Sequence, residues 1–297
     1  MVKLCPDMVC KKDIGQSVIN TLTYAGFYNS SLTSKEIYLR LISSKPISLS
    51  QVERSIGELK QRGKLKTKNG RYSVAQISDR TNSDFKQKLN KAKKDLRVLK
   101  KIPWLKFIGI SGSVASHSSK KDDDIDVVLI TSHHRLWLTR LLVMVLMRIS
   151  GKKIRRYGSS FYKDYYCFNL LLSEPDLKLP PKKRNLFNAY QLYFIESILD
   201  NNNLKEKLYL QNKFWVKKYL ANFANTISKD DNSTAGKSFD ANILGINFGK
   251  ILSWIDDLAY KAQRAYMSKK LKKEIISRNY AFFHPEDNSR IISEKLN

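Results

Sequence analysis

Cysteine is scarce in this chain, with three among 297 residues. Cys5 and Cys10 have no second pair at the spacing of a zinc site, and Cys167 stands apart from both. Neither a zinc site of that kind nor a disulfide framework is therefore expected, and sparse cysteine is typical of a reducing compartment. Residues 1–7 also lack the apolar core of a signal peptide. We therefore expect a cytoplasmic protein.

Long hydrophobic runs are also missing. The longest apolar stretch, 136–149, is interrupted by Arg140 and Arg148. A helix that crosses a bilayer needs about 20 consecutive apolar residues, so this stretch predicts a buried helix instead. No stable membrane insertion is expected.

Acidic residues are few, since 27 Asp and Glu stand against 54 Lys and Arg, a net charge of +27. Such a surface attracts polyanions, including nucleic acid, nucleoside triphosphates and anionic lipid. A composition merely rich in lysine and asparagine is the plainer alternative, so charge by itself does not choose a partner. Hydrophobic residues make up 42% of the chain, which is enough for packed cores in two or three modest domains.

The segment from residue 14 to 76 has the pattern of three helices followed by a hairpin. Apolar spacing predicts helices over 14–25 and 35–42 and a third that begins at Ser48 or Ser50, with Thr33 or Ser34 as the cap of the second. Asn69-Gly70 lies between two alternating runs and predicts a two-residue hairpin turn.

This order of elements resembles winged-helix domains. In DNA-binding members the third helix enters the major groove and the hairpin touches the backbone. The resemblance implies a nucleic-acid contact, and the alternative is a winged helix that binds protein or serves as a rigid arm. The positions that would contact nucleic acid are Gln51, Arg54, Lys60 and Arg62 on the helix and Lys64, Lys66, Lys68 and Arg71 on the hairpin.

The most informative segment lies between two apolar runs. Gly112-Ser113 follows the first run, and Asp124-Ile125-Asp126 begins the second. Glycine permits a tight turn after the strand predicted over 106–111, and Ser113 begins a short helix whose free N–H groups can bind phosphate oxygens. A glycine–serine pair is common in loops, so its weight depends on the acidic residues that follow.

Asp124 and Asp126 are two residues apart, so on a strand their side chains project to the same side. Neighbouring carboxylates repel each other unless a cation lies between them, and oxygen-only ligands suit Mg²⁺. We therefore predict that Asp124 and Asp126 bind magnesium, which would neutralise and orient a triphosphate. The alternative is a solvated acidic turn at 122–124, with Asp126 alone inside the strand.

Together these residues resemble the signature of the DNA polymerase beta-type nucleotidyltransferase superfamily: Gly112-Ser113, a spacer, and Asp124-Ile125-Asp126. The resemblance covers 106–174 and implies a mixed sheet flanked by helices, a nucleoside triphosphate as substrate and Mg²⁺ as cofactor. It also implies that Gly112 and Ser113 hold the triphosphate, and that Asp124 and Asp126 are the catalytic metal ligands.

The chain departs from the superfamily pattern at a third carboxylate, which that pattern places on a later strand. The strand predicted over 165–172 offers Asn169, whose amide oxygen can ligate a metal but cannot act as a base. Asp164 and Glu174, at the two ends of that strand, are the alternatives.

The rest of the chain is predicted to be mostly helical. Helices are expected over 79–101 and 134–150 and, after Pro181, over 185–199, 205–223 and 241–267, with a polar loop at 225–240. The expected fold is α+β. It comprises a winged-helix-like domain (1–78), a connecting helix (79–103), a nucleotidyltransferase-like domain with a mixed sheet (104–178) and a helical C-terminal domain (179–297).

Two functional hypotheses follow. The first is an enzyme that transfers a nucleoside monophosphate from a nucleoside triphosphate to a hydroxyl of RNA, protein or a small molecule and releases pyrophosphate. The second is a winged-helix nucleic-acid-binding protein whose nucleotidyltransferase-like domain is not catalytic, which Asn169 and the net charge of +27 favour. The sequence carries no signal for an oligomeric state.

Overall fold

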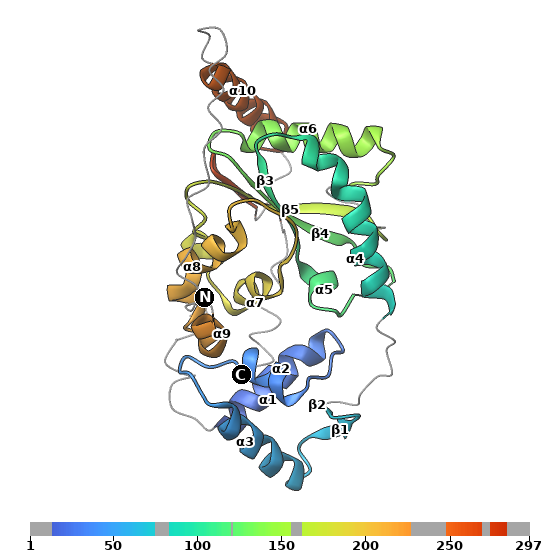
Figure 1. Cartoon of the computed structure of the whole chain (residues 1–297), viewed down its shortest axis with the longest axis vertical. Helices are drawn as coiled ribbons and strands as arrows, with labels where there is room; N and C mark the ends of the chain where they lie inside the picture. Colours follow the sequence, from blue (N-terminus) through green and yellow to red (C-terminus); the bar gives the residue numbers. More distant parts are fainter. Residues whose placement is uncertain are drawn as a thin grey trace.

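The structure, a computed structural model, describes residues 14–74, 83–119, 121–155, 162–226, 248–268 and 274–283. These residues form a mixed α+β fold, as expected. An N-terminal unit of three helices and a small hairpin lies at one end, and a six-stranded sheet flanked by helices forms the body (Figure 1).

The N-terminal unit follows its sequence signals closely. Thr33 and Ser48 cap the second and third helices, each in a capping box with the residue three positions later. Asn69 and Gly70 both have positive φ, as a two-residue hairpin turn requires. The elements are α1 (Ile14–Phe27), α2 (Ser34–Leu39), α3 (Leu49–Gln61), β1 (Lys66–Lys68) and β2 (Arg71–Ser73).

The prediction that the second helix extends to residue 42 is wrong. Helix α2 ends at Leu39, and the chain then runs along the body of the protein. The backbone N–H of Ile42 donates to Thr21 Oγ1 at 3.0 Å, and Ser43 pairs with backbone beyond α8. These partners are distant in sequence, so local spacing could not reveal them.

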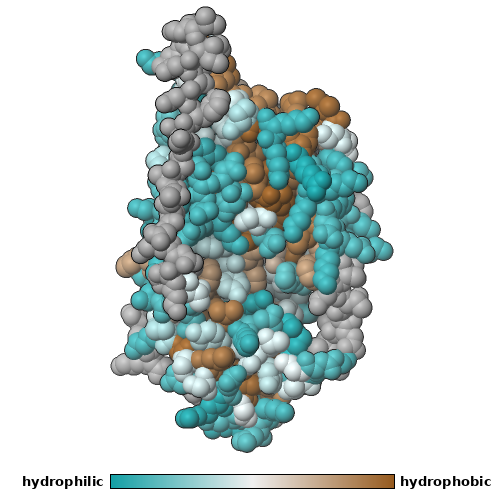
Figure 2. All heavy atoms as spheres, in the orientation of Figure 1, coloured by the Kyte–Doolittle hydropathy of each residue, from teal (hydrophilic) through white to brown (hydrophobic). Residues whose placement is uncertain are grey.

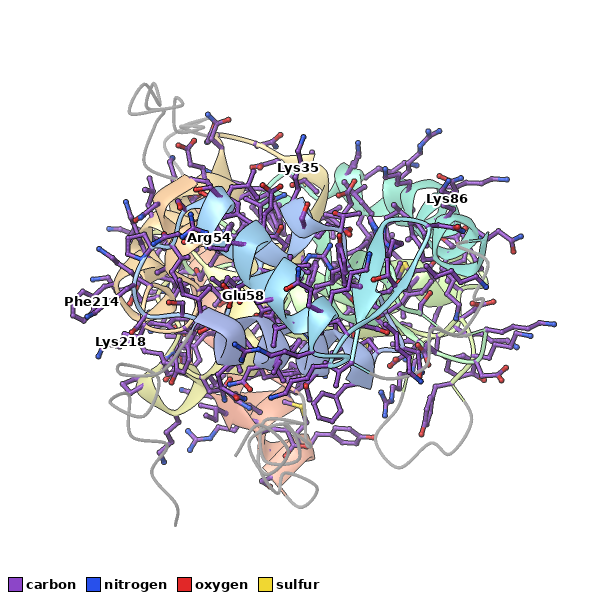
Figure 3. The ribbon with its side chains drawn as sticks, turned by 90° about the horizontal axis from the view of Figure 1, so that it is seen from below. Lys35, Arg54, Glu58, Lys86, Phe214 and Lys218 are labelled. Atoms are coloured by element: carbon purple, nitrogen blue, oxygen red, sulfur yellow. The ribbon has the colours of Figure 1, made fainter. Side chains whose placement is uncertain are left out.

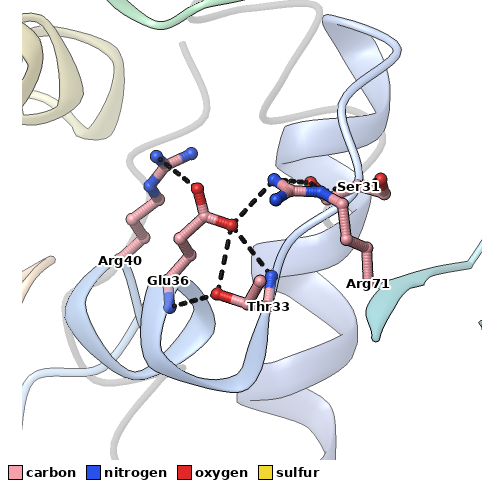
Figure 4. A network of polar contacts seen from close by, with 5 residues as sticks. All are labelled: Ser31, Thr33, Glu36, Arg40 and Arg71. Carbon is pink, nitrogen blue, oxygen red and sulfur yellow. Dashed lines mark hydrogen bonds and ion pairs between the residues drawn. The ribbon is translucent and has the colours of Figure 1, made fainter. Parts of the chain in front are cut away.

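A polar network fixes the start of α2 to the hairpin (Figure 4). Glu36 Oε2 accepts from the backbone N–H of Thr33 at 2.9 Å and from Arg71 Nη2 at 2.8 Å. The Arg71 guanidinium also donates to the backbone oxygen of Ser31. Arg71 is expected to contact nucleic acid from the hairpin. Its guanidinium is held by Glu36 and Ser31, and its side chain remains 40% exposed.

The main sheet has the strand order β6-β3-β4-β5-β8-β7. Strands β3 and β4 are antiparallel, β4 and β5 are parallel, and the remaining pairs are antiparallel, so the sheet is mixed. The strands are β3 (Leu105–Ile110), β4 (Ile125–Thr131), β5 (Tyr166–Ser173), β6 (Glu196–Asp200), β7 (Ile275–Ile276) and β8 (Tyr280–Phe282).

Several helix predictions need correction. The helix expected over 185–199 ends at Phe194, because residues 196–200 pair with the edge of β3 as strand β6. The helix expected over 205–223 is divided at the turn 217–220, and the last six residues of the one expected over 79–101 form a 3₁₀ helix, η2 (Leu96–Lys101). The observed helices are α4 (Ser83–Asp95), α7 (Leu186–Phe194), α8 (Leu204–Val216) and α9 (Ala221–Thr226).

Two other predictions fall largely outside the described residues. Of the polar loop expected at 225–240, the first two residues belong to α9 and the others are not described. The described part of the helix expected over 241–267 is α10 (Phe248–Ser268). The sheet takes β6, β7 and β8 from beyond residue 178, the expected end of the central domain.

Helices cover both faces of the sheet. One face packs against α4, η2, the short helix α5 (Gly112–Ala115) and α6 (Leu136–Ile149), with Trp137 and Leu129 in this core. The other face packs against α7 and α8, with Phe107 and Val128 in that core. Helix α10 lies on α6, where Asp256 Oδ1 accepts from the backbone N–H of Leu138 at 2.7 Å.

The outer sides of α6 and α10 leave large apolar side chains exposed. Figure 2 shows hydrophobic atoms gathered at the end of the molecule where Figure 1 draws these helices. The exposed apolar side chains there are Leu141, Val145 and Ile149 on α6 and Ile251, Trp254 and Leu258 on α10. No helix in the described part of the chain combines the length and apolar character needed to cross a membrane.

The N-terminal unit is docked on the body through α7 and the α8–α9 connection. The ring of Tyr24 stacks on that of Tyr190 with centroids 3.9 Å apart. Ser43 exchanges backbone hydrogen bonds with Tyr219 and Ala221 at 2.9 and 3.0 Å. Buried rings and paired backbone hold the two parts in one arrangement.

Asn222 supplies the most connected polar contact of this junction, and we predict that Asn222→Ala destabilises the protein. Its amide accepts from the backbone N–H of Ile47 and donates to the backbone oxygens of Tyr38 and Ile47, while the residue is 3% exposed. Unpaired buried groups would remain, so the free energy of unfolding should fall by about 2–4 kcal/mol in urea titration. Asn225→Ala, an exposed position on the same helix, should change it by less than about 0.5 kcal/mol.

Candidate functional site

Gly112 forms a sharp turn between β3 and the short helix α5. It has a φ of +65°, and a Cβ atom at this position would lie 1.9 Å from Asp126 Oδ2. The backbone N–H of the preceding residue, Ser111, donates to the backbone oxygen of Asp126 at 3.0 Å. Only glycine fits, because the backbone here rests directly on the carboxylate of Asp126.

The two acidic residues lie at the beginning of β4. Asp124 immediately precedes the strand, and Asp126 is its second residue and 8% exposed. One oxygen of each carboxylate and Cys167 Sγ all lie within 4.8 Å of one another. The structure therefore brings Gly112, Asp124 and Asp126 together, and it adds a thiol that the sequence did not single out for this site.

Asn169 stands against the acid pair from the neighbouring strand. The parallel register places Asp126 opposite Cys167, and the register shifts just beyond Val127. Asn169 Nδ2 donates to Asp126 Oδ1 at 2.7 Å. An amide thus occupies the position next to Asp126 on the strand where a third carboxylate was sought.

The two alternative carboxylates are engaged elsewhere. Asp164, before β5, pairs with Lys88 at 3.2 Å. Glu174, after the opposite end of β5, pairs with Lys106 at 3.1 Å. Asn169 is therefore the residue of the three whose hydrogen bond to Asp126 the structure records.

Two further residues contact the site, and neither carries a specific signal in the sequence. Arg155 Nη1 lies 2.6 Å from Asp124 Oδ2. Gln191 Oε1, on α7, accepts from the backbone N–H of Gly112 at 2.9 Å. Both come from segments distant in sequence, so tertiary folding alone brings them here. Ser113 is half-buried at the start of α5.

Burial makes this site electrostatically unfavourable without a cation. Removal from water, together with the neighbouring charge of Asp124, raises the pKa of Asp126 from 3.8 to about 8. Burial and the same two carboxylates raise the pKa of the Cys167 thiol. A divalent cation between the carboxylates would relieve this crowding, so the oxygens of Asp124 and Asp126 fit Mg²⁺.

The proposed nucleic-acid face carries both signs of charge. Figure 3, viewed from below, shows Arg54 and Glu58 along the outward side of α3. Arg54, Lys60 and Arg62 are exposed, but Glu53 and Glu58 are exposed on the same helix. Of the other expected contacts, Gln51, Lys64, Lys66 and Lys68 are also exposed.

We predict that Gly112→Ala destabilises the protein markedly. Alanine at a φ of +65° is strained, and its methyl group would overlap Asp126 Oδ2. The free energy of unfolding should fall by at least about 2 kcal/mol in urea titration. Gly57→Ala is the matched control, because nothing lies within 4 Å of a Cβ there and alanine favours its helix. Equal effects of the two substitutions would contradict the proposed contact.

The raised pKa of Asp126 predicts how stability depends on pH. The unfolded carboxyl ionises near pH 4 whereas the folded one ionises near pH 8, so the metal-free protein loses stability as pH rises through this window. Asp126→Asn cannot ionise. In EDTA the free energy of unfolding of this variant should exceed that of the wild type by on the order of 2–4 kcal/mol at pH 8. Near pH 4 the two values should match.

Urea titrations across this pH range measure the effect, with the exposed residue Asp122 as control. Asp122→Asn should follow the wild-type curve. The assignment fails if wild type and Asp126→Asn show the same pH dependence.

The glycine turn, the acid pair and the amide of Asn169 therefore form one compact site at the junction of β3, β4 and β5. Comparison of the chain with protein-family models, with curated proteins and with solved structures finds no significant match. Function is accordingly inferred from the residues of this site and their contacts.

Proposed function

We propose that this chain is a nucleotidyltransferase that moves a nucleoside monophosphate from a nucleoside triphosphate to a hydroxyl acceptor and releases pyrophosphate. One observation carries the proposal: the backbone of a phosphate-type turn at Gly112 rests on a buried carboxylate, Asp126, that adjoins a second carboxylate, Asp124. Such a pairing would bring a triphosphate and its metal ligands within one small volume.

Asp124 and Asp126 would hold Mg²⁺ through their carboxylate oxygens. When bound, the cation neutralises charge on the triphosphate and orients it for in-line attack. Arg155 now pairs with Asp124 at 2.6 Å, and its guanidinium is also suited to a phosphate oxygen. If Arg155 exchanged Asp124 for a phosphate oxygen, Asp124 would become available to the cation.

The start of α5 would receive phosphate oxygens through backbone N–H groups. The N–H group of Gly112 already donates to Gln191 Oε1 at 2.9 Å. The donors proposed for the triphosphate are therefore the next two backbone N–H groups, of Ser113 and the residue after it, together with the Ser113 hydroxyl. Gln191 holds the turn in place from α7.

Because residue 169 is an asparagine, its position next to Asp126 supplies no third carboxylate. Its amide donates to Asp126 Oδ1 and holds that carboxylate in place, but it cannot accept a proton from the attacking hydroxyl. We infer that the acceptor hydroxyl loses its proton to solvent or to the substrate phosphates, which makes transfer slow compared with a site that has its own base.

Labelling with each nucleoside triphosphate, Mg²⁺ and cell extract tests the proposal. The wild type should label an acceptor, and Asp124→Ala/Asp126→Ala should reduce the rate at least about 100-fold, because both proposed metal ligands are lost. Asp122→Ala, an exposed acid just before the pair, should retain the rate. Asn169→Asp should raise the rate by restoring a carboxylate. Equal labelling by wild type and the double variant would refute the enzyme.

Nucleic-acid binding without catalysis is the second candidate. One observation favours it: each carboxylate of the pair already has a partner within the protein, Arg155 for Asp124 and Asn169 for Asp126. In this case the exposed cations of α3 and the hairpin would contact phosphates, and the body would serve as a scaffold.

This candidate predicts binding to duplex DNA or RNA that weakens steeply with salt. Arg54→Ala/Arg62→Ala should remove about two phosphate contacts, which lowers the slope of log K against log salt by about 1.8 for duplex DNA. Lys218→Ala is the control, since this exposed lysine belongs to the turn after α8 and not to α3 or the hairpin. Fluorescence anisotropy at several salt concentrations measures both. Absence of binding at low salt would exclude the candidate.

A further inference from the structure

A cavity lies between α7 and the sheet, next to the acid pair. The empty space within it, which includes open solvent at its mouth, is about 520 Å³, and both Ser111 and Asn169 line it. These two residues adjoin Asp126, since Ser111 donates to its backbone oxygen and Asn169 to its carboxylate. The cavity and the acid pair therefore share a wall.

Lys183 lines this cavity and is the residue that indicates a ligand. It ends a short 3₁₀ helix, η3 (Pro181–Lys183), and is 7% exposed, whereas the preceding Lys182 is exposed. Within the described residues its ammonium group makes no hydrogen bond or ion pair. Its ammonium nitrogen keeps some contact with solvent, so an anion that enters the cavity can pair with it.

Two other buried ionisable residues of this protein have charged partners within the chain. Lys88, 5% exposed, pairs with Asp164 and donates to the backbone oxygen of Asp123. Asp95, 8% exposed, pairs with Lys91 and Lys152. The fold compensates these two residues with its own groups, whereas no side chain of the described residues pairs with Lys183.

We propose that this cavity binds a small ligand whose anionic group, a phosphate or a carboxylate, pairs with Lys183. The rest of the lining is mainly apolar, with the rings of Phe187 and Phe282, and the amide of Gln191 adds a polar contact. The ligand therefore combines an anionic group with an apolar, ring-containing body. A ligand without the anion would leave the ammonium group unpaired.

The reading of this ligand as a substrate rests on the proposed function, because the cavity adjoins the acid pair. Two sources of the anion share the same chemistry. One is the phosphate chain of the nucleotide itself, and the other is an acidic group on the acceptor molecule.

Binding is tested by calorimetry and thermal denaturation of the full chain in EDTA, so that neither metal nor turnover is needed. The probes are pyrophosphate and ATP for the first source, and phenyl phosphate and benzoate for the second, with adenosine as the uncharged comparison. At least one anionic probe should bind the wild type and raise its Tm, and adenosine should not. The probe pair that binds identifies the source.

Lys183→Met should weaken binding of that probe at least tenfold, since a charged hydrogen bond is removed while side-chain length is kept. Lys182→Met is the matched control and should bind as the wild type does. Lys183→Gln gives a second variant should Lys183→Met fail to fold.

The proposal is overturned if none of the anionic probes binds the wild type, or if the Lys183 variants bind as tightly as Lys182→Met. Its failure and that of the proposed function remain distinguishable. Anion binding in EDTA without any nucleotide transfer would uphold the Lys183 site alone, and transfer without anion binding would uphold the enzyme alone.

Discussion

The contact between the backbone of Gly112 and the carboxylate of Asp126 is the constraint on which the site depends. All seven residues of β4 are buried, so Asp126 cannot turn outward to water. The turn at the end of β3 closes over it and leaves no room for a Cβ atom at position 112. A proposed phosphate-binding turn and a proposed metal ligand are thus held together by the antiparallel pairing of two adjacent strands. Any ligand of one must lie close to the other.

Burial acts on the pKa of two carboxylates, Asp95 and Asp126, with opposite net results. At Asp95 burial favours a raised pKa, but hydrogen bonds from Lys152, Lys91 and Tyr166 outweigh it and lower the pKa to about 2. At Asp126 burial and Asp124 dominate, and the pKa rises to about 8. The fold pairs Asp95 with two lysines, and within the described residues it places no lysine against Asp126 in the same way. A buried carboxyl with a raised pKa, next to a cavity that Lys183 lines, is a pattern associated with ligand-binding sites.

Local signals in the sequence were sufficient for the N-terminal unit and for the strand–turn–strand segment of the site. Thr33 and Ser48 cap helices because their hydroxyls accept from backbone three residues away, which is a local interaction. Gly112 and Asp126 were identified because a glycine turn and alternate strand positions are also local features. The failures concern partners distant in sequence: residues 196–200 become strand β6 because the edge of β3 is open to them, and the pattern there fits a helix equally well.

The sequence by itself determined the α+β class, the caps, the hairpin turn and the presence of an acid pair after a glycine turn, because each depends on residues within a few positions of one another. Only the tertiary structure decided what stands opposite that pair. Asn169, Arg155, Cys167 and Gln191 reach the site from separate segments, and the burial that shifts the pKa of Asp126 is a property of the packed sheet. The same reason applies to Lys183, whose sequence neighbour Lys182 is equally basic: the packing of α7 against the sheet, and no local pattern, leaves one lysine buried beside a cavity and the other in solvent.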